Sequence, residues 1–324
     1  MDKDDSFPIS LIIPVYNESK TIAALIDTIR KQSLQPAEVI IVDAGSADNT
    51  IELIKQLSGN NQLFQIIEAG RAMPGKARNI GAEKAKYEWL AFTDAGISLH
   101  KDWLKNLEQK ARETNGATVV YGNYTPQISN LFEMCATITY VPPRQQNAIR
   151  EKFIASCLLK KEVWTKVGGF PDWRAAEDLI FMEKAEADKA VIITAPDAMV
   201  YWQLRPDLAS TYKRFDLYSK YNVWAGRQAF WHYGIAKQYA IMLVFIVLGF
   251  VHSWYWLLLL PVWLMARAIK RIASHRFEFG WKPLYNPAAF LLIIIITLTI
   301  DAATFSGWIK ALLQKDGYRK VSME

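Results

Sequence analysis

Residues 239–266 limit the fold of this chain more than any other stretch, because they contain no Asp, Glu, Lys or Arg over 28 consecutive positions. About 20 apolar residues are enough to cross a bilayer, and an uncharged run of this length is rare in a soluble protein. A second apolar run, residues 287–309, has Asp301 as its one charged residue. Tyr and Trp gather at the ends of both runs, as at membrane interfaces. We therefore expect two or three membrane segments within residues 238–309.

The basic loop 267–286 bears on the membrane topology. It sets five basic residues against Glu278 alone: Arg267, Lys270, Arg271, Arg276 and Lys282. If residues 239–266 form one tilted helix, this loop lies on the side opposite the N-terminal part; if they form a hairpin turning near residues 251–253, the loop returns to the same side. The tendency of basic loops to stay in the cytoplasm favours the hairpin and three segments, although each arm is then short for a full span. Asp301 is expected to mark where the last segment emerges into an interfacial helix, rather than to be a buried charge.

The net charge and the cysteine content argue against a nucleic-acid binder and against a protein built on zinc or disulfides. The net charge is +6, but the basic residues border the apolar runs instead of forming one soluble stripe, which argues against a nucleic-acid binder. Cys135 and Cys157 have no paired spacing and indicate neither a zinc site nor a disulfide framework.

Residues 9–122 alternate between strand-like and helix-like patterns. Apolar runs of strand length occur near residues 9–15, 38–43, 64–68 and 88–93, and segments with helical spacing lie between them. Nearly continuous apolar strands that alternate with helices predict a parallel sheet covered on both faces.

Polar side chains follow each of these four strands. The first is followed by Tyr16-Asn17-Glu18, the second ends at Asp43, the third precedes residues 71–79, and the fourth precedes Asp94. Asp and Asn commonly form turns, so each position alone is weak evidence. Together they place three carboxylates and a basic cluster at the carboxyl ends of neighbouring strands, where ligands of such sheets bind.

Five segments now resemble a known family. The segments LIIPVYNES, VIIVDAGSADNT, GRAMPGKARNIGA, WLAFTDAG and GGFPDWRAAEDLIFMEKA occur in the order seen in family 2 glycosyltransferases, which are inverting enzymes with the GT-A (Rossmann-like) nucleotide-sugar fold. The resemblance covers about residues 9–230, and the tail is similar to that of membrane-anchored bacterial members. It implies a catalytic domain over residues 1–205, an interfacial amphipathic region over 206–237, and a polar tail over 310–324.

For the nucleotide, the resemblance implies a pocket at the ends of the first two strands. It would be lined by Pro14, Tyr16, Asn17 and Glu18, with Glu18 near the ribose. Asp43 would accept an N–H from the base. The alternative is that these residues only form turns and cap helices. UDP is the favoured nucleotide and GDP is possible.

The GRAMPGKARNIGA segment is expected to face the diphosphate. Gly75 opens a predicted helix whose first amides favour anions, and Arg71, Lys76 and Arg78 add positive charge. Asn79 is expected to orient the loop rather than to touch the sugar. The alternative is a solvated basic helix start.

In the resembling enzymes the fourth strand ends in Asp-X-Asp, which holds a divalent cation against the diphosphate. This chain keeps Asp94, followed by Ala95, but has Gly96 at the third position. We expect Asp94 and Ala95 to line the donor site and Asp94 to bind Mn²⁺ or Mg²⁺, with phosphate oxygens and water completing the shell. The missing carboxylate should weaken metal binding before the nucleotide arrives.

The Glu177-Asp178 pair opens another predicted helix. In the resembling enzymes the Asp of this pair removes a proton from the acceptor hydroxyl, so Asp178 is the candidate base and Glu177 would contact the acceptor or the loop. Simple capping of the helix is the alternative. Arg205 or Arg214 could reach the diphosphate or the acceptor, although residues 203–206 depart from the Gln-X-X-Arg-Trp of polymer-extruding synthases.

These features predict a metal-assisted transferase that moves one sugar from a nucleotide-diphosphate sugar to a lipid or lipid-linked hydroxyl. Its catalytic domain would lie on the cytoplasmic face of a bacterial inner membrane. Two alternatives stay open. One is a transferase whose acceptor is a polyprenyl phosphate, and the other is a non-catalytic, nucleotide-sugar-binding membrane scaffold.

Overall fold

The computed structural model describes residues 7–59 and 61–314, which divide into two compact units. The α/β unit comprises the chain up to Gln127 together with Gln145–Gln203. The helical unit comprises Ile128–Arg144 and the chain from Leu204 onward. The α/β unit thus differs from the expected domain 1–205 by the internal segment Ile128–Arg144 and by residues 204–205, which belong with the C-terminal helices. Residues 315–324 of the expected polar tail lie outside the described residues.

The α/β unit is built on one eight-stranded sheet in the order β3-β2-β1-β4-β7-β6-β8-β5. The four strands predicted from the sequence are parallel neighbours: β1 (Ile9–Val15), β2 (Glu38–Asp43), β3 (Phe64–Glu68) and β4 (Trp89–Phe92). The other half is mixed, since β7 is antiparallel to β4 and β6, and β5 is antiparallel to β8. These strands are β5 (Ile97–Leu99), β6 (Val119–Gln127), β7 (Cys157–Lys160) and β8 (Ile192–Gln203).

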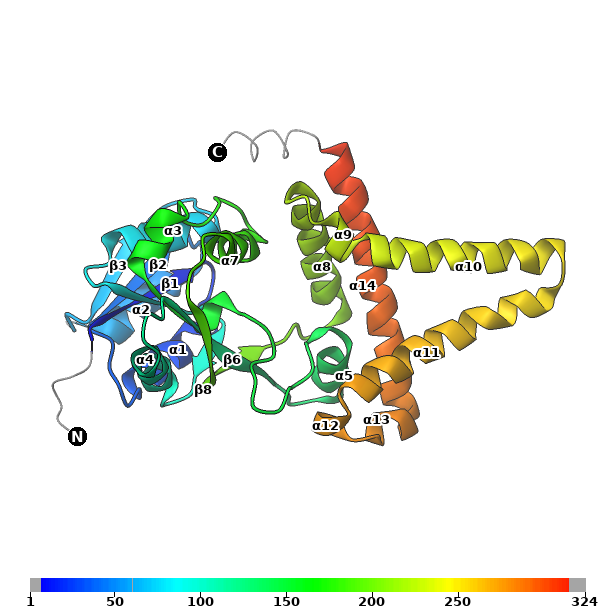
Figure 1. Ribbon diagram of the computed structural model, residues 1–324, viewed down its shortest axis with the longest axis horizontal. Helices are drawn as coiled ribbons and strands as arrows, with labels where there is room; N and C mark the ends of the chain where they lie inside the picture. Colours follow the sequence, from blue (N-terminus) through cyan, green and yellow to red (C-terminus); the bar gives the residue numbers. More distant parts are fainter. Residues whose placement is uncertain (1–6, 60, 315–324) are drawn as a thin grey trace. The chain divides into compact units, whose positions relative to one another are not determined.

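Helices cover both faces of this sheet (Figure 1). On one face, Ala77 and Phe181 from two helices join Ile12, Val42 and Phe92 from the strands in one buried cluster. These helices are α3 (Pro74–Lys84) and α7 (Glu177–Ala187), which lie together in Figure 1. The remaining helices of the unit are α1 (Ile22–Arg30), α2 (Thr50–Ser58), α4 (Trp103–Glu113), the short 3₁₀ helix η1 (Ile154–Ser156) and α6 (Lys161–Lys166). The predicted covering of both faces is confirmed, but the predicted parallel sheet is wrong for the half that contains β5 and β7, which pair antiparallel.

Within the residues that the structure describes, the helical unit has two helices long and apolar enough to cross a membrane, by length and composition: α10 (Tyr233–Val251) and α14 (Pro287–Leu313). Their mean hydropathies are 2.0 and 2.3. Its elements are α5 (Leu131–Tyr140), α8 (Leu208–Trp224), α9 (Gln228–Trp231), α10 (Tyr233–Val251), the 3₁₀ helix η2 (Trp254–Leu258), α11 (Leu259–Ser274), α12 (Arg276–Phe279), α13 (Lys282–Tyr285) and α14 (Pro287–Leu313). Most of the expected basic loop 267–286 is therefore helical.

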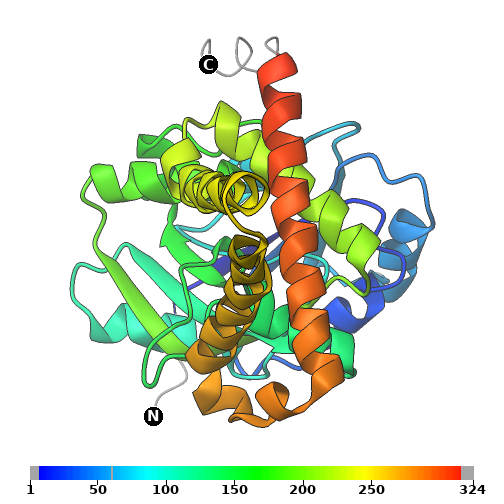
Figure 2. The ribbon, with the colours of Figure 1, turned by 90° about the vertical axis from the view of Figure 1, so that its right-hand side faces the viewer.

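The chain reverses between α10 and α11, as the hairpin interpretation predicts. The backbone N–H groups of His252 and Ser253 both donate to the Leu248 carbonyl, at 2.9 and 3.1 Å. Figure 2 shows this hairpin end-on, in yellow, with α14 beside it in orange to red.

Asp301 does not behave as expected. It is 2% exposed in the middle of the unbroken helix α14, so no separate interfacial helix starts there. Its carboxylate accepts two bonds from Arg267 on α11, at 2.5 and 3.0 Å, and one from Tyr239 on α10, at 2.9 Å. The prediction was wrong because a local hydropathy pattern does not show a partner 34 residues away.

The predicted interfacial helix α8 packs along α14. A Cβ at Gly307 would lie 2.2 Å from the Asp216 carbonyl, so only glycine permits this approach. At the same contact the Ser219 hydroxyl donates to the Thr304 carbonyl, at 2.6 Å. Part of α8 is therefore buried against another helix of its own unit.

Candidate active site

The strand register brings the predicted polar residues to one edge of the sheet. Val15 at the end of β1 pairs with Asp43 at the end of β2, and Asp43 pairs with Glu68 at the end of β3. Asp94 follows β4, which runs parallel to β1. The carboxyl ends of four parallel strands therefore meet where the sequence placed the site.

The loop after β1 is tied to the loop after β2. Asn17 has φ 54° and accepts a hydrogen bond from the Ala47 amide at 2.8 Å, while its own amide donates to Ser46 at 2.9 Å. The Glu18 amide donates to the Thr50 hydroxyl at 2.8 Å. These contacts fix the backbone of both loops, so Asn17 shapes the rim through its own side chain.

The remaining residues predicted to line this pocket differ in exposure. The Tyr16 ring is 44% exposed, with the Arg174 guanidinium 5.5 Å from its centre. Pro14 and Glu18 are half-buried, and the Glu18 carboxylate accepts from the Thr21 hydroxyl at 2.5 Å. Tyr16 thus offers the open apolar surface of this loop.

The two carboxylate oxygens of Asp43 differ in their hydrogen bonding. Its Oδ2 accepts from the amides of Gly45 and Ser46, at 2.9 and 3.0 Å. Its Oδ1 is buried and has no hydrogen-bond partner within residues 7–59 and 61–314. A buried acceptor without a donor is costly, so this oxygen suits an N–H supplied by a ligand.

Gly75 has a different role from the expected one. A Cβ at this position would lie 1.8 Å from the Pro171 carbonyl oxygen, so glycine allows the segment before α7 to rest on α3. The Gly75 amide lies 3.5 Å from the Trp173 carbonyl and is not open to an anion. The exposed cations of this segment are Arg71 and Lys76.

Asn79 fixes the same segment, whereas the sequence led us to expect that it orients its own loop. Its Oδ1 accepts from the Phe170 amide at 2.8 Å and from the Trp164 ring at 2.9 Å. Its Nδ2 donates to the Phe170 carbonyl at 2.7 Å. Three hydrogen bonds thus attach the chain leading into α7 to α3.

Arg78 is the centre of a charged cluster that the sequence pattern did not reveal. Its side chain is 5% exposed, and its two terminal nitrogens donate to Glu177 at 2.7 Å and to Asp94 at 2.8 Å. Although burial opposes the charged form, Asp94, Glu177 and Asp178 raise the pKa of Arg78. Arg78 was expected to bind the diphosphate. In the structure its guanidinium instead links Asp94, after β4, to Glu177 at the start of α7.

The carboxylates at the start of α7 are held in an unusual environment. Burial and the neighbouring Asp178 raise the pKa of Glu177 to about 7, against the opposing effect of Arg78. Burial also raises the pKa of Asp178, whose Oδ1 accepts from the Leu179 amide at 2.9 Å. Ala176 just before them has φ 62°, a strained conformation for alanine. A carboxylate with a raised pKa in a fixed position suits proton transfer near neutral pH.

A divalent cation fits this site only in part. Asp94 gives one oxygen to Arg78 and its side chain is 37% exposed, which allows the carboxylate to serve as one ligand. A Cβ at Gly96 would meet nothing within 4 Å, so space is open beside it, while Ala95 is buried. The described chain has no group of three or more His, Cys, Asp or Glu placed to hold a metal. The other ligands would have to be substrate oxygens and water.

The two arginines predicted to reach the substrate belong to the helical unit. Arg214 on α8 donates to the Tyr218 hydroxyl at 2.5 Å, and its guanidinium lies 4.8 Å from the centre of that ring. Arg205 lies between β8 and α8. Their contribution to the site stays a prediction.

Comparison with known proteins agrees with the sequence resemblance. Residues 10–170 match the model of Glycosyl transferase family 2. The chain is 31% identical to Glycosyltransferase GlyG of Streptococcus pneumoniae over 117 residues, which are 36% of this chain and 38% of GlyG. It is 28% identical to Glycosyltransferase AglE of Haloferax volcanii over 195 residues, which are 57% of this chain and 63% of AglE. The match therefore spans less than two thirds of either relative.

Among solved structures, the chain is similar to mannosyltransferase PcManGT from Pyrobaculum calidifontis, crystallised with GDP-Man and Mn²⁺. The TM-score is 0.68 at 17% identity, and the match covers 97% of this chain and 89% of the other. At this identity the likeness establishes the fold, and the predicted GT-A fold class is confirmed.

Proposed function

We propose that this protein moves one sugar from a nucleotide-diphosphate sugar to a hydroxyl of a lipid or lipid-linked acceptor, with inversion. The chain belongs to glycosyl transferase family 2, through a domain that makes up about half of its length. The observation that carries the proposal is the cluster in which Arg78 joins Asp94 to Glu177, with Asp178 beside them. It combines a carboxylate at a strand end with a candidate base at a helix start.

The nucleotide would lie over the loops after β1 and β2. Asp43 Oδ1, buried and without a partner in the described chain, would accept the base N–H, and the exposed Tyr16 ring would offer apolar contact. Arg71 and Lys76, both exposed, would meet the diphosphate. UDP is the favoured donor nucleotide. GDP is possible, since PcManGT was crystallised with GDP-Man.

Asp178 would act as the base. It takes the proton of the acceptor hydroxyl while the acceptor oxygen bonds to the anomeric carbon and the bond from that carbon to the phosphate oxygen breaks. The nucleoside diphosphate leaves, and the configuration at the anomeric carbon inverts. Glu177 acts through Arg78, since its ion pair holds the guanidinium that in turn holds Asp94. A raised pKa brings the carboxylate closer to the pH at which it must accept a proton.

Asp94 would hold Mn²⁺ or Mg²⁺ through the oxygen that Arg78 leaves free. When bound, the cation neutralises charge on the departing diphosphate. Because Gly96 supplies no second carboxylate, we expect metal affinity to depend on the nucleotide.

Membrane attachment would come from the helical unit. Helices α10 and α14 support it by their length and composition, and the basic residues at the end of α11 support a cytoplasmic location for the catalytic unit, as in a bacterial inner membrane. A lipid acceptor follows from this placement.

Two alternatives make different demands on Asp178. A polyprenyl phosphate acceptor is already ionised and needs no base, and a scaffold that only binds nucleotide sugar performs no transfer. The fixed carboxylates at the start of α7 favour the hydroxyl acceptor.

The test is a transfer assay with the full-length protein in nonionic detergent. UDP- and GDP-sugars are screened against extracted membrane lipids, with Mn²⁺, Mg²⁺ or EDTA, and products are identified by mass spectrometry. We expect Asp178→Asn to lower turnover about 10²- to 10⁴-fold, while Asp172→Asn, an exposed carboxylate six residues earlier, leaves it unchanged. Full activity of Asp178→Asn would favour the phosphate acceptor, and no product from any donor would favour the scaffold.

A further inference from the structure

Two arginines one turn apart on α11 differ in their partners. Arg267 forms a bidentate ion pair with Asp301. The guanidinium of Arg271 makes no ion pair and no side-chain hydrogen bond with any part of the chain that the structure describes. Asp301 accepts three hydrogen bonds already, two from Arg267 and one from Tyr239. One positive charge of this helix therefore has no carboxylate within ion-pair distance among residues 7–59 and 61–314.

Arg271 lines a cavity of about 390 Å³. Its walls come from α5 and the chain just after it, α8, the end of α11, and α14. Arg271 shares this lining with an apolar surface to which Ile138, Phe215 and Ile300 contribute. A charged donor and an apolar wall thus face the same space.

Three other polar side chains of this cavity are hydrogen-bonded to the backbone. Thr139 donates to the Cys135 carbonyl at 2.7 Å, and Ser274 donates to the Arg271 carbonyl at 2.7 Å. The two ring nitrogens of His275 lie 2.9 Å from the Val141 carbonyl and 3.0 Å from the Arg271 carbonyl. The Arg271 guanidinium and the buried Tyr140 hydroxyl, which has no hydrogen-bond partner in the described chain, are therefore the donors left for a ligand.

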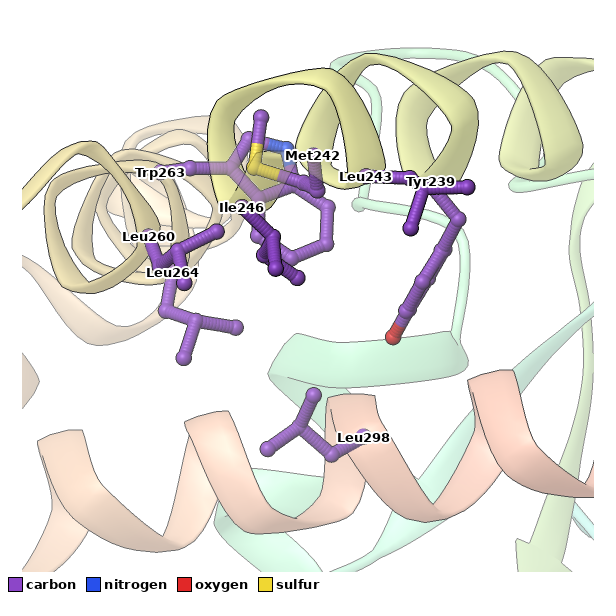
Figure 3. Close-up of a pocket in the computed structure, with 8 residues that line it drawn as sticks. All are labelled: Tyr239, Met242, Leu243, Ile246, Leu260, Trp263, Leu264 and Leu298. Carbon is purple, nitrogen blue, oxygen red and sulfur yellow. The ribbon is translucent and has the colours of Figure 1, made fainter. Parts of the chain in front are cut away.

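A second cavity in the same unit has the opposite character (Figure 3). It measures about 400 Å³ and lies between α10, α11 and α14. The residues that line it carry no charge, and the hydroxyl of Tyr239 donates to Asp301. Nothing in this lining favours an anion. Of these two cavities, therefore, only the Arg271 cavity is expected to attract a negatively charged ligand.

We propose that the Arg271 cavity binds the phosphate group of a lipid, with the start of the lipid chain against Ile138, Phe215 and Ile300. A half-buried guanidinium without a counter-ion is unfavourable, and an anion that enters the cavity relieves that cost. Phosphate matches the fork of arginine donors in geometry and charge. A lipid matches the apolar wall, part of which belongs to α14, one of the two helices able to cross a bilayer.

This inference rests on the proposed function in one respect, the placement of the helical unit in a membrane. It deepens that function by naming the chemical class that the helical unit recognises, a lipid that carries phosphate. Both a phosphate-linked lipid with a sugar hydroxyl and a lipid phosphate belong to this class.

The test is a binding titration with the full-length protein in nonionic detergent, read by native mass spectrometry. Three probes separate the sources of the signal: dioctanoyl phosphatidic acid, dioctanoylglycerol with the same chains, and inorganic phosphate. We expect the phosphatidic acid to bind most tightly. Arg271→Gln should weaken it about 10- to 100-fold, which is the usual range for a charged hydrogen-bonded contact.

Lys270→Gln is the matched control, because Lys270 is exposed and its loss removes the same charge from the same helix turn. It should leave binding unchanged, and Arg271→Lys should retain part of it. Arg271→Gln should melt at or above the temperature of the wild type without lipid, since it removes an unpaired charge. A lower melting temperature with unchanged binding would instead assign Arg271 a structural role and overturn the proposal.

Two further outcomes would overturn it. Equal binding of phosphatidic acid and dioctanoylglycerol would show that the chains alone are recognised, and inorganic phosphate binding as tightly as the lipid would show a site for a free anion. The assay uses no sugar donor. A protein that binds the probe through Arg271 but transfers no sugar refutes the proposed transfer, and one that transfers sugar without this binding refutes the inference alone.

Discussion

Each unit of the molecule buries arginine and carboxylate side chains, but the two units balance them in opposite ways. In the α/β unit one guanidinium, Arg78, lies among the carboxylates of Asp94, Glu177 and Asp178. In the helical unit one carboxylate, Asp301, forms an ion pair with Arg267, while Arg271 one turn further forms no ion pair in the described chain. The first cluster has an excess of acid, and the second has an excess of base.

This difference indicates which ligand each cluster is suited to. Excess carboxylates favour a cation or a transferred proton, which agrees with the proposed roles of Asp94 and Asp178. An excess guanidinium favours an anion, which agrees with lipid phosphate at Arg271. Changing one charge at a time should show whether the stability and ligand binding of each unit depend on its unbalanced charge, rather than on the presence of ion pairs alone.

The largest effect is expected from Arg78→Gln. It leaves Glu177 buried without its partner and should cost about 3–5 kcal/mol of stability, the usual result of breaking a buried ion pair from one side. Thermal unfolding in detergent measures this, and sugar transfer should fall with it because Asp94 loses its support. Lys55→Gln is the control, since Lys55 and Glu68 form a solvent-exposed pair at 2.6 Å and such pairs contribute little to stability. Equal losses of stability in both variants would show that the buried Arg78 cluster contributes no more than an exposed ion pair.

Asp301→Asn makes the corresponding change in the helical unit. It leaves Arg267 without its carboxylate partner, and we expect a loss of about 2–3 kcal/mol, smaller than for Arg78 because a long arginine side chain can bend toward solvent or headgroups. The addition of Arg267→Gln should recover most of the loss, as a double-mutant cycle in the same melting assay would show. A double variant less stable than Asp301→Asn would indicate that Arg267 acts through other contacts.

The sequence predicted the framework of the α/β unit because the relevant signals are local. Apolar runs of strand length, each followed by polar residues, were enough to place β1 to β4 and to bring Asp43 and Asp94 to one edge. The order of the five family segments added the GT-A fold.

The charged clusters were not predicted, because they join residues far apart in the chain. Arg78 and Glu177 are separated by 99 positions, and Arg267 and Asp301 by 34. No periodic pattern encodes such pairs, so Arg78 was assigned to the diphosphate and Asp301 to the membrane interface. Gly75 was misjudged for the same reason, since its neighbour Pro171 lies almost a hundred residues later.

The pH dependence of stability tests the acid excess. Burial and Asp178 raise the pKa of Glu177 from 4.5 to about 7 in the folded protein, so the folded state binds more protons than the unfolded state between these values. Stability should therefore decrease as pH rises through this window, by about 2 kcal/mol between about pH 5.5 and 7.5. Glu177→Gln, which keeps an acceptor for Arg78, should show a flatter pH profile of melting temperature. An identical slope in both proteins would mean that Glu177 is not the titrating group.

The smallest effect is expected from Lys310→Gln, which also removes one partner of an ion pair in the helical unit. Lys310 is 49% exposed and lies 2.7 Å from Asp216, which also accepts a bond from the Ser306 hydroxyl at 2.6 Å. Because solvent can replace the ammonium and Ser306 remains, the loss should be about 1 kcal/mol or less in the melting assay. A loss as large as that of Asp301→Asn would show that burial does not separate the two pairs, and the contrast between paired and excess charge would then lose its physical basis.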